Sequence, residues 1–96
     1  SIAGLVGARS ISGQIDRLLI EPQRILILDY KSDRPAPHSA DDVAPAYLRQ
    51  MGAYRAALAR LYPNRAIVTA LLWTEVPRLM PLPDDLVRAY APGAEE

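Results

Sequence analysis

The sequence predicts a mixed α/β fold of the α+β kind, with a central mixed sheet. Its parts are an antiparallel three-stranded meander, a crossover helix and a further strand. The apolar run at residues 25–28 and the largely apolar stretch at residues 66–74 are typical of buried strands. Between them, over residues 47–61, apolar side chains recur at spacings of four, three, four and three, as on one side of a helix. A strand, a helix and a strand in that order favour a parallel pair joined by a crossover.

Three strands are expected in the first third of the chain, over residues 2–8, 11–20 and 24–31. Short links between them favour the antiparallel meander, and Pro22 suits a turn before the third strand. Because strand side chains alternate, Asp16 shares a face with the apolar residues that follow it two and four positions later. The continuous apolar run in the third strand predicts that this strand is buried on both faces.

The second half begins with a proline-containing loop, followed by a helix that starts at about Asp42 or Pro45 and ends at residue 61. Proline is favoured in the first turn of a helix. The apolar stripe of this helix consists of Tyr47, Met51, Tyr54, Leu58 and Leu61.

A buried strand over residues 66–74 is expected to lie parallel to a neighbour, with Trp73 in the core. Residues 78–82 would form an edge strand between two prolines, and residues 84–90 a short helix. That helix would turn Leu86, Val87 and Tyr90 inward.

Composition fits one small domain over residues 1–96, with 50% hydrophobic and 23% charged residues. The longest apolar runs are too short to span a bilayer, so no membrane partner is expected. Zero net charge argues against a broadly basic nucleic-acid-binding surface. The absence of cysteine excludes disulfides and is typical of the cytoplasm. The chain opens on Ser1 without a visible signal peptide, which suggests a fragment of a longer protein.

The candidate site starts from Asp29 and Lys31, which end the third strand and point to the same side. Lys31 is the only lysine among eleven cations, and a lysine has a movable pKa that suits a catalytic position. Asp16 adds a second carboxylate from the neighbouring strand. Two carboxylates and a lysine can hold Mg²⁺ or Mn²⁺ beside a phosphate. Alternatively, Asp29 and Lys31 form a solvated pair, and Asp16 pairs with Arg17 or Arg24.

Gln50 and Tyr54 are four positions apart and therefore neighbours on one helix face. In a functional interpretation, Gln50 hydrogen-bonds a nucleotide or a catalytic group, and Tyr54 stacks on a base or bonds a phosphate. In the alternative, Tyr54 is a core aromatic with its hydroxyl at the rim, and Gln50 is helix surface. His38, the only histidine, is expected to be a solvent-exposed loop residue.

Three segments in order carry a family resemblance: residues 13–17 (Gly-Gln-Ile-Asp-Arg), 27–32 (Ile-Leu-Asp-Tyr-Lys-Ser) and 50–54 (Gln-Met-Gly-Ala-Tyr). They resemble the PD-(D/E)XK nucleases of the RecB-like branch. Residues 46–51 and 70–74 are similar to the C-terminal nuclease domain of AddA subunits of AddAB helicase–nucleases, in their alphaproteobacterial form. The resemblance covers about residues 3–82.

The resemblance implies a restriction-endonuclease-like core and a metal-dependent DNA nuclease domain, which acts in double-strand-break repair by recombination. Asp16, Asp29 and the carbonyl of Tyr30 would bind the metal, Mg²⁺ or Mn²⁺, and Lys31 would be the catalytic lysine. Gln50 and Tyr54 would position DNA or support the site. The implied partners are DNA and a second helicase–nuclease subunit.

The family carries a further acidic or histidine ligand on a helix before the first strand, and we expect this chain to start after that helix. Such a fragment, truncated at its N-terminus, would bind metal weakly and cut poorly. ATP hydrolysis is not expected, since the sequence has no G-x-x-x-x-G-K-[ST] loop.

Two competing hypotheses stay open at this point. One is a non-cleaving module with a nuclease fold that binds DNA or a partner subunit. The other is a small structural domain whose motifs are coincidental, which requires Asp16 and Asp29 to lie far apart.

Overall fold

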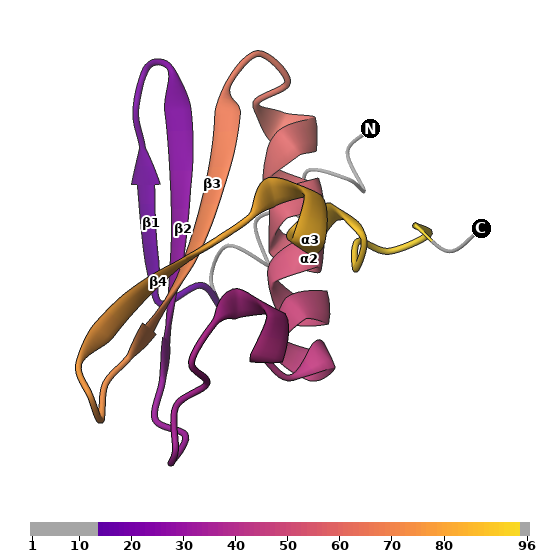
Figure 1. Ribbon diagram of the computed structural model, residues 1–96. Helices are drawn as coiled ribbons and strands as arrows, with labels where there is room; N and C mark the ends of the chain where they lie inside the picture. The colour runs from indigo at the N-terminus through magenta and orange to yellow at the C-terminus, as the bar shows by residue number, and fades with distance from the viewer. Residues whose placement is uncertain (1–13, 95–96) are drawn as a thin grey trace.

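The computed structural model describes residues 14–94 (Figure 1). The expected strand over residues 2–8 lies outside the described residues. Within the described part the elements are, in order, β1 (Arg17–Ile20), β2 (Arg24–Lys31), the 3₁₀ helix η1 (Ala40–Asp42), α2 (Pro45–Leu61), β3 (Ala66–Trp73), β4 (Arg78–Leu82) and α3 (Asp84–Arg88). The predicted fold class, a mixed sheet with helices, is confirmed.

The sheet has the order β1-β2-β3-β4, so each strand pairs with the next one along the chain. β2 and β3 form the predicted parallel pair, with Arg24 opposite Ala66 and Lys31 opposite Trp73. α2 is the crossover between them (Figure 1). β1 and β4 pair antiparallel at the two edges, which confirms the edge position expected for residues 78–82.

Two elements have the predicted bounds. β2 covers residues 24–31, and α2 covers residues 45–61 with Pro45 in its first turn. β3 ends at Trp73, one residue earlier than predicted, and α3 ends at Arg88, two residues earlier.

The bounds predicted for the second strand were wrong. β1 begins only at Arg17, residues 14–16 precede it, and residues 11–13 lie outside the described part of the chain. The cause lies at Asp16, whose N–H donates to the carboxylate of Asp29, whereas a ladder bond would go to a backbone carbonyl. Side-chain hydrogen bonds replace the ladder at this end of the strand.

Helices α2 and α3 cover one face of the sheet (Figure 1). Ile25, Ile27 and Asp29 alternate onto this covered face, and Val87 of α3 is fully buried against the core. Trp73 is 1% exposed, as predicted. The buried residues of α2 are Leu48, Met51, Gly52, Tyr54 and Leu58, whereas Tyr47 and Leu61 are half-buried. The predicted stripe was therefore correct in direction but omitted Leu48 and Gly52.

The other face of the sheet corrects the prediction that the third strand is buried on both sides. Leu26 and Leu28 point to this second face and are half-buried. On the same face Leu19 is 47% and Leu79 is 57% exposed. Among residues 14–94, helices cover one side of the sheet only (Figure 1). A continuous apolar run therefore marked a strand with one fully buried and one partly covered face.

None of the helices in the described part of the chain combines the length and apolarity needed to cross a bilayer.

Candidate functional site

The predicted site residues meet where β2 ends and β1 begins, at the lower end of the sheet in Figure 1. Asp29 and Lys31 are the last two inward-facing residues of β2, and both lie on the face covered by α2. Asp16 stands one position before β1, where it is opposite Asp29 if the pairing of Arg17 with Leu28 is continued by one residue. Strand pairing thus brings the two aspartates together.

The two carboxylates are held by reciprocal hydrogen bonds. The backbone N–H of Asp16 donates to Oδ1 of Asp29 at 3.3 Å. The backbone N–H of Tyr30 donates to Oδ2 of Asp16 at 2.9 Å. Asp29 is 3% exposed, whereas Asp16 faces solvent. The carboxylate of Asp29 is therefore fixed inside the protein, and that of Asp16 lies at the surface.

Lys31 joins this pair to the helix. Its Nζ lies 3.1 Å from Oδ2 of Asp29 and 2.7 Å from Oε1 of Gln50. The side chains of Lys31 and Asp29 are only 12% and 5% exposed. Removing two charges from water is costly unless they are paired and hydrogen-bonded, and both conditions are met.

The amide of Gln50 has one possible orientation in this network. A lysine ammonium can only donate hydrogen bonds, so Oε1 of Gln50 must face Lys31. Its Nε2 is then left to donate to the hydroxyl of Tyr54, at 3.0 Å. The Tyr54 oxygen accepts this bond and keeps its own hydrogen for donation. Asp29, Lys31, Gln50 and Tyr54 form one continuous hydrogen-bonded chain.

The surroundings of Tyr54 keep this hydroxyl neutral. Burial raises the pKa of Tyr54 above its usual value of 10.0, and the negative charges of Asp29 and Asp16 raise it further. The hydrogen bond from Gln50 lowers the pKa of Tyr54, but the net direction is upward. Tyr54 therefore remains a phenol, with a hydrogen to donate, throughout the neutral range.

One residue that sequence reasoning did not assign to the site, Tyr47, also reaches Lys31, and Asp33 in turn bonds Tyr47. The ring centroid of Tyr47 lies 4.2 Å from Nζ of Lys31, within the range of a cation–π contact. The Tyr47 hydroxyl donates to Oδ1 of Asp33 at 2.8 Å, and this bond raises the pKa of Tyr47. The only sequence signal was the position of Tyr47, one turn before the Gln50–Tyr54 pair on α2.

The remaining predicted residues are placed as follows. The side chain of Tyr30 is 40% exposed and points to the opposite face of the sheet, so only its backbone can serve the site. Its carbonyl as a metal ligand stays a prediction. His38 is exposed, as expected.

The alternative interpretations of the acidic residues do not hold. Asp29 and Lys31 form a buried pair, not a solvated one. Arg24, one of the two expected partners of Asp16, bonds Glu21 at 2.6 Å. The hypothesis of coincidental motifs required Asp16 and Asp29 to lie far apart. They are instead directly bonded, because the backbone N–H of Asp16 donates to the carboxylate of Asp29.

The carboxylates fit a hard divalent cation. Asp16 and Asp29 offer four oxygens with two lone pairs each, and the hydrogen bonds described above use only part of that capacity. Magnesium is usually held by one or two carboxylates and keeps several waters. In residues 14–94 there is no group of three or more acidic or histidine side chains placed to hold a metal. Within the described residues, Asp16 and Asp29 are the carboxylates that lie together next to Lys31.

Comparison with known proteins agrees with this arrangement. The family model of the PD-(D/E)XK nuclease superfamily matches residues 2–88. No curated protein and no solved structure gave a match. Members of the superfamily are typically metal-dependent nucleases that act on DNA. Since the match covers nearly the whole sequence, and the mixed sheet is consistent with the restriction-endonuclease-like fold, the chain belongs to the PD-(D/E)XK nuclease superfamily.

Proposed function

We propose that this chain is the nuclease domain of an AddA-type subunit of an AddAB helicase–nuclease. In this proposal, residues 1–96 form a single domain of a longer cytoplasmic protein that hydrolyses phosphodiester bonds at DNA ends during double-strand-break repair. Mg²⁺ or Mn²⁺ is its cofactor, and DNA and a second helicase–nuclease subunit are its partners. Family membership supports the nuclease activity. The similarity of residues 46–51 and 70–74 to AddA subunits supports the finer assignment.

One observation supports the catalytic proposal above all others. Asp29 and Lys31 come from one strand and Asp16 from another segment, and the three meet in one bonded cluster. A structural core has little use for a buried carboxylate and a buried ammonium, such as those of Asp29 and Lys31, since removing charges from water costs free energy.

Each residue has a role in this proposal. Asp16 and Asp29 hold the divalent ion, which when bound supplies polarisation of a phosphate oxygen and a lowered pKa of water. Lys31 directs its ammonium at the charge that develops on the phosphoryl oxygens. It can do so because Gln50 and Asp29 fix its Nζ in place before substrate arrives.

Gln50 and Tyr54 are positioning residues, which orient Lys31 and the substrate. Gln50 holds Lys31 by its oxygen and Tyr54 by its nitrogen, so the three groups move together. The neutral hydroxyl of Tyr54 offers a hydrogen bond to a phosphate or to a water without adding negative charge.

The test is cleavage of end-labelled DNA by the wild-type chain and by Asp29→Asn, with Mg²⁺, with Mn²⁺ and with EDTA. The exchange keeps the size of the side chain and removes the charge. We expect slow wild-type cleavage with either metal, none with EDTA, and a rate about a hundredfold lower in the variant than in wild type, because a metal ligand is lost.

Asp41→Asn is the matched control, since Asp41 is an exposed aspartate in η1. It should cut as fast as wild type. Equal rates for wild type and Asp29→Asn, or cleavage that persists in EDTA, would overturn the catalytic assignment.

A second candidate function is a module that binds DNA or a subunit without cutting it. The observation in its favour is that residues 14–94 bring two, and not three, acidic side chains to the site. This function predicts that the wild-type chain binds DNA ends and leaves them intact with either metal.

A further inference from the structure

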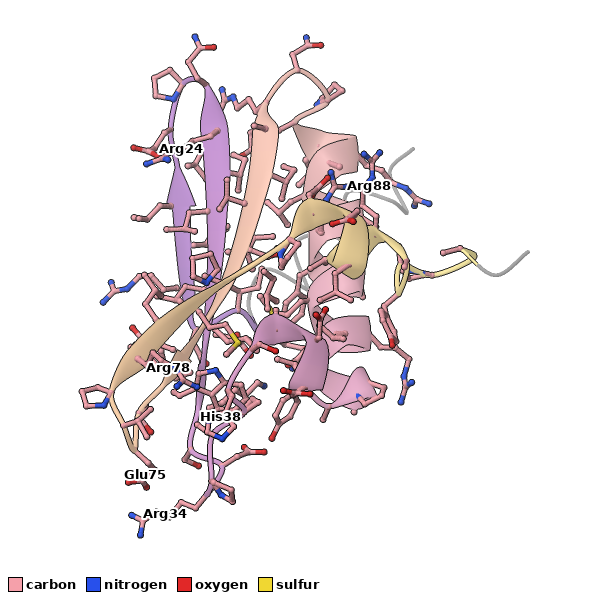
Figure 2. All side chains as sticks on the ribbon, in the orientation of Figure 1. Arg24, Arg34, His38, Glu75, Arg78 and Arg88 are labelled. Atoms are coloured by element: carbon pink, nitrogen blue, oxygen red, sulfur yellow. The ribbon has the colours of Figure 1, made fainter. Side chains whose placement is uncertain are left out.

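A cavity of about 340 Å³ lies beside the site, between the loop after β2 and the start of α2. Figure 2 labels His38 in this loop. The residues that line it are Asp33, Pro35, Ala36, Pro37, His38, Asp42, Ala44, Tyr47 and Trp73. This volume is within the range of small-ligand pockets. None of the roles assigned above uses it.

Contacts with the opposite edge of the sheet hold the loop that forms this cavity. Arg34 bonds Glu75, in the turn between β3 and β4, at 2.7 Å. Arg78 of β4 donates to the carbonyl of Pro37. Figure 2 labels these two arginines and Glu75 at the same end of the molecule as His38. The loop after β2 is therefore bonded to the rest of the protein at two points, and the cavity is formed before a ligand binds.

The lining selects the kind of ligand. The rings of His38 and Tyr47 give flat surfaces of the kind that stack on planar groups, and two prolines and Trp73 add to the apolar lining. Asp33 and Asp42 add carboxylates that repel phosphate and accept hydrogen bonds from N–H groups. The ligand should be planar, not anionic, and carry N–H donors. A nucleobase meets all three conditions.

Tyr47 connects this cavity to the candidate site. Its ring lines the cavity, and its centroid lies 4.2 Å from Nζ of Lys31. A phosphate at Lys31 and a group in the cavity would therefore touch the same tyrosine. A nucleotide unit carries a planar, uncharged base next to a phosphate and would therefore suit both places.

We propose that the cavity binds one unstacked nucleobase of the DNA strand whose phosphate lies at Lys31. The proposal rests on the nuclease function proposed above and adds a requirement to it. The substrate must present a base that is free of its partner, as in a single-stranded end. A single-stranded end offers such a base without a base pair that must first be broken.

The test uses Trp73, which lines the cavity and is the only tryptophan of the chain. Its fluorescence is followed without divalent metal, as the protein is titrated with single-stranded thymidine oligonucleotide. The comparison ligand has the same number of phosphates but abasic sugars. We expect quenching by the first ligand, and affinity at least about fivefold lower for the second, because base stacking is lost.

A pair of variants tests whether the base enters this cavity. Ala44→Phe fills it from the exposed start of α2, whereas Ala46→Phe adds the same ring two residues further on, at an exposed position outside the lining. The first variant should bind both oligonucleotides equally weakly. The second should keep the wild-type difference.

Three outcomes would overturn the proposal: equal quenching by both oligonucleotides, no quenching by either, or quenching by an oligolysine peptide alone. The last would assign the cavity to a basic side chain of a protein partner. Cleavage with Mg²⁺ is measured separately on the same oligonucleotides. Base-dependent quenching without cleavage contradicts the nuclease function but keeps the base site. Equal cleavage of the thymidine and the abasic oligonucleotide supports the nuclease function but contradicts the base site.

Discussion

At the scale of single residues, the site is a chain of hydrogen bonds in which each member fixes the next. Asp29 orients Lys31, Lys31 orients the amide of Gln50, and Gln50 bonds Tyr54. Such networks are worth more than their separate bonds when every member is satisfied, and they are costly when one is removed. The lone lysine of the sequence is therefore held from two sides, by a strand residue and by a helix residue.

Gln50→Leu tests this network. The leucine has a similar size but leaves Lys31 with one hydrogen-bond partner and removes the donor to Tyr54. We expect a loss of about 1–3 kcal/mol in the free energy of unfolding, the usual cost of leaving buried polar groups unsatisfied. Urea denaturation measures it. Arg49→Leu, at the exposed neighbouring position, should stay within about 0.5 kcal/mol of wild type. A small and similar change in the free energy of unfolding of Gln50→Leu and Arg49→Leu would contradict a stabilising role of the network.

The sequence allowed Asp16, Asp29, Lys31, Gln50 and Tyr54 to be named, because each lies in a motif with a recognisable spacing. Strand alternation placed Asp29 and Lys31 on one side, and helix periodicity placed Gln50 next to Tyr54. Tyr47 and Asp33 could not be found in the same way. Their contacts join the end of β2, the loop after it and α2, and such contacts depend on how the elements pack.

At the scale of elements, the helix α2 shows what a hydrophobic pattern omits. Gly52 is buried in the middle of α2, although it has no side chain to contribute to an apolar stripe. A Cβ atom at this position would lie 2.9 Å from the carbonyl carbon of Tyr90 and 3.0 Å from the backbone nitrogen of Ala91. Glycine is required here because the backbone that follows α3 packs directly on the helix.

Gly52→Ala should therefore destabilise the protein, even though alanine is the better helix former by about 1 kcal/mol. The colliding atoms belong to the backbone and cannot move aside as a side-chain tip would. Forcing extra volume into a packed interior costs about 1–3 kcal/mol. We expect a net loss of about 1 kcal/mol, measured as a lower midpoint in urea. Ala56→Gly makes the reverse exchange in the same helix. Its effect on the midpoint measures the difference in helix propensity between alanine and glycine, without the collision. A midpoint above that of wild type for Gly52→Ala would refute the close approach.

The elements themselves were largely predictable from periodicity and proline positions. β2 and α2 have the predicted bounds because their apolar patterns are long and end in clear breakers. The start of β1 was not predictable. Alternation of apolar residues continues through Ile15, and nothing in that pattern indicates that side-chain bonds at Asp16 replace the ladder.

At the scale of the whole molecule, the two faces of the sheet differ: one carries both the core and the candidate site, and the other is only partly covered. Helices α2 and α3 cover the face on which Asp29 and Lys31 lie, so the core and the site share one side (Figure 1). The carboxyl ends of β2 and β3 lie at the same end of the sheet because the two strands are parallel. The site, the loop after β2 and the start of α2 therefore meet there.

The parallel pair followed from the crossover helix, but the coverage of the second face did not follow from the sequence. An unbroken apolar run such as residues 25–28 is compatible with burial on both faces or with one partly covered face. Only the packing of the helices distinguishes them, as the exposure of Leu19 and Leu79 shows.

We propose that Asp16 and Asp29 hold a divalent cation next to Lys31. Mn²⁺ is paramagnetic and broadens the NMR signals of nearby amides, so a titration with substoichiometric Mn²⁺ locates the ion directly. We predict that the amide signals of Asp16, Asp29, Tyr30 and Lys31 disappear first, and that Asp29→Asn removes the effect. Broadening centred instead on the exposed acidic pair at residues 84–85, with the signals of Asp16 and Asp29 intact, would contradict the account.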